Sequence, residues 1–154
     1  MTTPPAPSSP ATSPALALGD QAFLDAFMAC QLSPADFDHT GHLRIAWLLL
    51  QRHALADAVA LTCQGIARLA AHLGVPGKYH HTLTEALVRL MAHGGAATLA
   101  WPDFLAANPR LVHDAPGLLA MHWSPQALAH PEARAHFVPP DRLPLPALSD
   151  DPHR

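Results

Sequence analysis

Residues 55–73 read LADAVALTCQGIARLAAHL, and one set of positions in this stretch recurs at intervals of three and four residues. That interval places the set on one face of an α-helix, the face that a protein buries against neighbouring helices. The positions of this face are Leu55, Val59, Thr62, Ile66, Leu69 and Leu73. Gly74 follows directly, and glycine is common just beyond a helix end. The stretch therefore predicts one long amphipathic helix.

The segments on either side repeat the helical interval, and none of them alternates convincingly like a strand. Further helices are predicted over residues 20–30, 38–52, 79–93, 102–107 and 115–122, with short pieces starting at Ser124 and Pro131. The sequence thus predicts an all-α fold, an irregular helical bundle of about five to seven helices, some of them short.

Proline-rich ends bound the helical part of the chain. Residues 1–17 are rich in Pro, Ser, Thr and Ala and carry no charged side chain. Such a segment cannot bury enough apolar surface to offset the entropy of ordering, so we expect a disordered tail. Residues 138–154 repeat proline too often for a helix and predict an extended strap or a tail. Residues 18–137 then form a single helical domain.

Charge and apolar pattern exclude two classes of partner. The chain has 9 Lys and Arg, 12 Asp and Glu and a formal net charge of -3. Nucleic-acid binding needs a basic surface, so no nucleic acid is expected. No apolar run approaches the roughly 18–20 residues of a membrane span. With no recognisable secretory signal and no metal or redox spacing at Cys30 and Cys63, a cytoplasmic protein is expected. The low surface charge and the helical architecture permit a homodimer without requiring one.

Three of the 12 histidines fall on apolar helix faces. His39 and His42 lie one turn apart at the start of the predicted helix 38–52. His80 lies at the start of the predicted helix 79–93, on the side that carries its leucines. Short connections make successive helices run up, down and up, so these two helices start at the same end of the bundle. We therefore expect the three imidazoles to face one another there.

Three neutral imidazoles around an open position suit a catalytic divalent metal. We predict a mononuclear site in which His39, His42 and His80 bind one divalent transition metal ion, Zn, Fe, Cu or Ni. His81 and His122 are further candidates for the same site. The alternative for such histidines is a structural one, as helix caps or as hydrogen-bonded core residues.

Three side chains near these histidines are candidate catalytic residues. Arg44 could hold a substrate carboxylate with its planar guanidinium group, although a solvated arginine is the plainer interpretation. Tyr79, the only tyrosine in the chain, could donate a hydrogen bond or act as an acid. Glu85 could orient a ring nitrogen or add a carboxylate ligand.

These features together predict a small metal-dependent enzyme, acting on a small polar or anionic substrate at one end of a helical bundle. A hydrolase, a lyase and an oxygenase all fit this description. Two alternatives stay open. One is a non-catalytic small-molecule-binding or regulatory module with a pH-sensitive histidine cluster. The other is a metal-free enzyme in which His42 or His80 is the general base.

Two motifs carry a resemblance to other proteins. The pattern Phe-x-His-x-x-His-Leu-Arg-x-Ala-Trp occupies residues 37–47, and Tyr-His-x-Thr occupies residues 79–82. In these motifs the chain resembles a group of small uncharacterised bacterial all-helical proteins. The resemblance implies a helical fold. It implies no activity, because none is established for that group.

Overall fold

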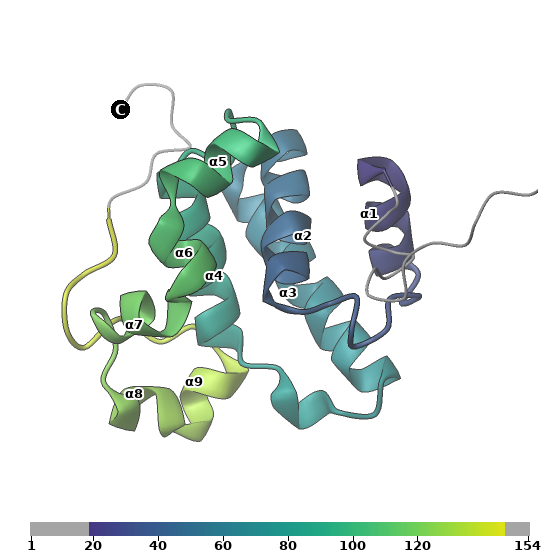
Figure 1. Cartoon of the computed structure of the whole chain (residues 1–154). Helices are drawn as coiled ribbons and strands as arrows, with labels where there is room; N and C mark the ends of the chain where they lie inside the picture. Colours follow the sequence, from purple (N-terminus) through teal and green to yellow (C-terminus); the bar gives the residue numbers. More distant parts are fainter. Residues whose placement is uncertain (1–18, 147–154) are drawn as a thin grey trace, which may run out of the picture.

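The computed structural model describes residues 19–146, and all regular structure in that range is helical (Figure 1). The helices are α1 (Asp20–Met28), α2 (His39–Arg52), α3 (Leu55–His72), the 3₁₀ helix η1 (Pro76–Lys78), α4 (His81–His93), α5 (Trp101–Ala107), α6 (Pro109–His113), α7 (Ala115–Ala120), α8 (Pro125–Ala129) and α9 (Pro131–Ala135). The all-α prediction is confirmed. The described part of the chain has more helices than predicted, because its C-terminal third breaks into short ones.

The long helix α3 lies at the centre of the bundle and runs antiparallel to α2 and α4, which pack against it (Figure 1). Its buried face includes Thr62, Ile66 and Leu69, as the spacing in 55–73 predicts. Gly65 lies where α3 meets α1, and a Cβ at this position would overlap the ring of Phe27. The small residue is therefore what allows the aromatic side chain of α1 to approach the α3 backbone.

Helices α2 and α4 both begin with a side-chain cap. The Oδ1 atom of Asp38 accepts a hydrogen bond from the Gly41 amide at 2.9 Å. The Nδ1 atom of His80 accepts one from the Leu83 amide at 3.2 Å. Such caps satisfy amide groups of the first turn, which have no partner inside the helix. His80 is therefore the residue before α4 rather than a member of the helix, which the sequence predicted to start near residue 79.

Residues 137–146 form a segment without helix that returns across α4 and the short helices (yellow in Figure 1). The Thr82 hydroxyl on α4 accepts a hydrogen bond from the Val138 amide at 3.1 Å. Asp141 accepts hydrogen bonds from the amide and the hydroxyl of Ser124, at 2.8 and 2.6 Å. These two bonds lower the pKa of Asp141. These bonds help to hold the segment against α4 and against the start of α8.

The expected tail 1–17 and the end of the proline-rich segment, residues 147–154, lie outside the described residues. Across residues 19–146, no helix is both long enough and apolar enough to cross a membrane.

Candidate functional site

A cavity of about 270 Å³ opens between the starts of α2 and α4, the middle of α3 and helix α7. Its wall contains all three histidines that the sequence predicted to converge, His39, His42 and His80. The rest of the wall is mainly apolar and includes Ala46, Ile66, Leu83, Leu87, Val88 and Leu119. The antiparallel arrangement of the three long helices therefore brings the predicted residues together.

A second cavity of about 280 Å³ adjoins the first. Both cavities are lined by His42, Ile66, Lys78 and Tyr79, so these four side chains lie at the junction. We call the two together the two-lobed cavity. A mainly apolar wall with a few convergent polar groups is typical of small-molecule sites, and each lobe is near the lower end of their usual size of about 300–1,000 Å³.

His42 lies at the junction of the two lobes with one ring nitrogen in use. Its Nδ1 is 2.8 Å from the carbonyl oxygen of Asp38, and because a carbonyl only accepts, Nδ1 carries the proton. The ring stacks on Phe37, with 3.9 Å between centroids. Burial lowers the pKa of His42, and the hydrogen bond to Asp38 offsets part of this effect. The imidazole is therefore neutral at pH 7.

The other two histidines bond to backbone groups far along the chain. The Nε2–H of His39 donates to the carbonyl of Leu111 at 2.7 Å, and that of His80 donates to the carbonyl of Leu128 at 2.9 Å. Because the Nδ1 of His80 also accepts from Leu83, both ring nitrogens of His80 are in use. His80 has the capping role that was the structural alternative, and it also ties α4 to α8.

The geometry bears on the predicted metal site. Within residues 19–146, no group of three or more His, Cys, Asp or Glu side chains is arranged to hold a metal ion. A metal bound by His39, His42 and His80 would require His80 to break one of its two hydrogen bonds. His122 does not line the two-lobed cavity, and its Nδ1–H donates to the carbonyl of Leu143 at 2.9 Å. The three-histidine metal site stays a prediction.

Thr62 contributes a further polar group to the wall of the first lobe. Its side chain is only 1% exposed. Among the described residues, its Oγ1 is the one buried side-chain polar atom without a hydrogen-bond partner. Leaving a buried hydroxyl unpaired costs about 1–3 kcal/mol. The sequence placed Thr62 on the core face of its helix and gave no sign that the hydroxyl would be unpaired.

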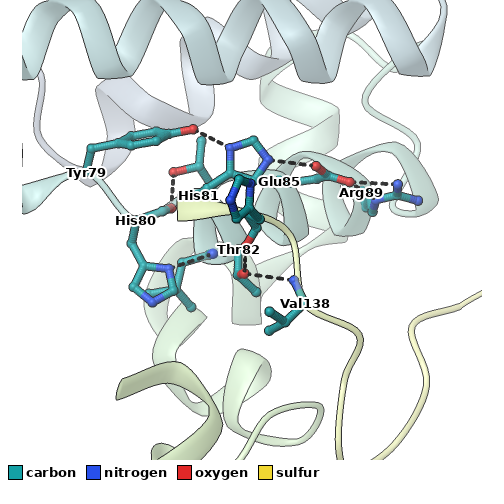
Figure 2. A network of polar contacts seen from close by, with 10 residues as sticks. Tyr79, His80, His81, Thr82, Glu85, Arg89 and Val138 are labelled. Atoms are coloured by element: carbon teal, nitrogen blue, oxygen red, sulfur yellow. Dashed lines mark hydrogen bonds and ion pairs between the residues drawn. The ribbon is translucent and has the colours of Figure 1, made fainter. Parts of the chain in front are cut away.

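A chain of polar contacts runs from Tyr79 along α4 (Figure 2). The hydroxyl of Tyr79 is 2.7 Å from Nδ1 of His81, and Nε2 of His81 is 3.1 Å from Oε1 of Glu85. Arg89 donates two hydrogen bonds to Oε2 of Glu85, at 2.9 and 2.7 Å. Because the carboxylate only accepts, Nε2 of a neutral His81 carries the proton, and Nδ1 then accepts from the Tyr79 hydroxyl.

Cys63 on α3 lies near Tyr79, and each of the two groups influences the pKa of the other. Burial raises the pKa of the Cys63 thiol to about 11. Burial also raises the pKa of Tyr79, and the neighbouring Cys63 adds to the effect. Both groups are therefore protonated at neutral pH. Cys63 is a buried free cysteine.

The predicted catalytic residues separate into two places. Tyr79 and Glu85 are joined through His81, which the sequence analysis named only as a further candidate for the metal site. Positions 81, 85 and 89 are four residues apart, and this spacing was the sequence pattern that could have indicated the contacts among them. Arg44 does not line the two-lobed cavity. Its Nη2 is 3.1 Å from Oδ1 of Asp20 on α1, and its guanidinium lies over the ring of Phe23. Position 44 faces α1, so Arg44 connects two helices.

No protein-family model, curated protein or solved structure matches this chain. The chemistry of the residues around the cavity is therefore the basis on which a function can be proposed.

Proposed function

We propose that this protein binds a small, largely apolar molecule in the two-lobed cavity and holds its polar end at Thr62 and His42. The observation that carries the proposal is that Thr62 lines a mainly apolar cavity, and that its buried hydroxyl has no hydrogen-bond partner among the described residues. An acceptor atom on a bound molecule would pair with this hydroxyl. An O–H or N–H of the same molecule would donate to the Nε2 lone pair of His42.

We further propose that His42 acts as a general base on that molecule, so that the protein is a metal-free enzyme. A base must be unprotonated at the working pH, and burial of His42 favours its neutral form. After His42 takes a proton at Nε2, its Nδ1–H still donates to the Asp38 carbonyl, so the ring keeps its orientation. Lys78 is exposed and borders both lobes, where its charge would attract an anionic group of the substrate.

The metal-dependent enzyme predicted from the sequence is the second candidate. The observation in its favour is that His39, His42 and His80 line one cavity. Elemental analysis of untagged protein separates the two candidates. About one metal ion per chain that is lost in His42→Ala would support a metal centre. Absence of metal after reconstitution would support the metal-free proposal. The cytoplasmic location and the homodimer stay predictions.

Thermal unfolding with a set of small phenols, indoles and carboxylic acids tests the proposed binding. A molecule that binds only the folded protein raises Tm. We expect molecules that raise Tm for the wild type to do so less for Thr62→Val, and not at all for Leu87→Trp, which fills the first lobe. Thr98→Val changes an exposed threonine away from the cavity and is the matched control. Equal shifts in all four proteins would place the ligand elsewhere.

A further inference from the structure

The polar chain on α4 has a geometry that the proposed function does not use. Tyr79, His81 and Glu85 form a hydroxyl–imidazole–carboxylate series with contacts of 2.7 and 3.1 Å (Figure 2). A nucleophile within hydrogen-bond reach of a base that is itself oriented by a third group is the arrangement of covalent catalysis on many unrelated folds. Arg89 binds the second carboxylate oxygen, which leaves the first one to hold His81.

Tyr79 is the member of this series that lines the two-lobed cavity. The Tyr79 side chain borders both lobes, where an entering molecule would meet it. Thr62 lines the same first lobe, and its buried hydroxyl, unpaired among the described residues, is a donor that a developing oxyanion could use. Lys78 precedes Tyr79 and adds a positive charge at the junction of the lobes.

We propose that Tyr79 is the nucleophile of an acyl-transfer site that accepts small esters. The Oη of Tyr79 attacks the carbonyl carbon of the ester while its proton moves to Nδ1 of His81. The oxyanion of the tetrahedral intermediate accepts a hydrogen bond from Thr62. The bond from carbon to the leaving alcohol breaks, and the alcohol oxygen takes the proton from His81. Water then attacks the acyl-tyrosine and gives its proton to Nδ1 of His81. The bond from the acyl carbon to Oη breaks, Oη takes that proton from His81, and the acid is released.

The attack does not require a phenolate in the resting protein. The serine of a Ser-His-Asp triad is also protonated at rest, and its proton is removed during the attack. The raised pKa of Tyr79 is consistent with this order of events. The Cys63 thiol beside it is a weak competitor, because the thiolate is the reactive form and burial raises the thiol pKa to about 11. Glu85 and Arg89 are positioning residues in this scheme.

The inference rests on the proposed function in one respect, that the cavity admits a small molecule. In the experiment, full-length protein is incubated with 4-nitrophenyl acetate. Absorbance monitors the release of 4-nitrophenolate, and mass spectrometry locates the modified residue. Because Tyr79 is the only tyrosine, an acetyl group on tyrosine has one possible position. We expect acetyl-Tyr79 in the wild type and none in Tyr79→Phe.

Variants of the base separate chemistry from structure. Loss of a general base typically lowers a rate by about 100-fold or more, so acetylation of Tyr79 should fall by about 100-fold in His81→Gln. Glu85→Gln should also lower it and should change its pH profile. His93→Gln replaces an exposed histidine at the other end of α4 and should acetylate at the wild-type rate. Circular dichroism confirms that each variant is folded.

Two results would overturn the proposal. One is acetylation of Lys78, His42 or Cys63 with none on Tyr79, and the other is an equal rate in the wild type and in folded His81→Gln. The ether 4-nitroanisole has no acyl group to transfer, so its effect on Tm tests binding in the cavity separately from acyl transfer. If it raises Tm but no acetyl-Tyr79 forms, the binding site stands and acyl transfer is wrong. If it does not bind and no acetylation occurs, both proposals are wrong.

Discussion

Replacing Thr62 by valine should raise the free energy of unfolding, although most substitutions in a protein interior lower it. Thr62 is 1% exposed, and its hydroxyl has no hydrogen-bond partner among the described residues. Valine has nearly the same shape and places a methyl group where the unpaired hydroxyl lies. Removing the desolvation cost of an unpaired hydroxyl is worth about 1–3 kcal/mol. For a chain of this length, that gain corresponds to a rise in Tm of about 3–9 °C.

The matched control is Thr82→Val, which makes the same change at a threonine on α4. Thr82 is 0% exposed. Unlike Thr62, its hydroxyl donates to the His136 carbonyl at 2.8 Å and accepts from the Val138 amide at 3.1 Å. Losing these bonds should lower the free energy of unfolding by about 1–3 kcal/mol. The same substitution at two equally buried threonines should therefore have opposite signs.

Urea unfolding of the wild type and the two variants, followed by circular dichroism, measures both values. The slope of free energy against urea should be equal in all three proteins, because none of the changes alters the surface exposed on unfolding. A Thr62→Val protein that is less stable than the wild type would refute the reasoning, because the hydroxyl would then have a partner in the folded protein.

Three further results are expected. In urea unfolding, His80→Ala should lower the free energy of unfolding by about 1–3 kcal/mol, because α4 loses its cap and the Leu128 carbonyl loses its donor. His80→Asn should keep the cap. Gly65→Ala should lower the free energy of unfolding by about 1–3 kcal/mol in the same assay, since the new Cβ overlaps the Phe27 ring. A Gly65→Ala protein as stable as the wild type would contradict the close packing of Phe27 on Gly65. Because the pKa of His42 is lowered in the folded state, the unfolded state binds more protons below about pH 6.5, so stability should fall as pH drops below that value. Thermal unfolding across this range should show a shallower fall in His42→Gln, and an identical fall would contradict the neutral buried ring.

The sequence was most informative where local periodicity determines structure. Positions 55–73 predicted α3 almost to its ends, because a long apolar face can be buried only as a helix. The short helix α6 was missed, since five residues cannot display a helical period. The convergence of His39, His42 and His80 on one cavity followed from short connections and antiparallel packing.

The hydrogen-bond partners of those histidines could not be predicted in the same way. The carbonyls of Leu111 and Leu128 lie 72 and 48 residues away from His39 and His80, and no local pattern connects them. The contact from His81 to Glu85 spans four residues on one helix, so it was within reach of spacing alone. For Arg44, periodicity could not specify which neighbouring helix its side chain would face.

Isothermal titration of a small molecule that raises Tm, into chelator-treated wild-type protein and into Thr62→Val, tests the proposed binding site most directly. We expect the wild type to bind after chelation, and Thr62→Val to bind about tenfold more weakly, which corresponds to the loss of about 1.4 kcal/mol from one hydrogen bond. Binding that disappears on chelation would instead place a metal in the site. Equal affinity in the two proteins would show that the molecule does not bind at Thr62.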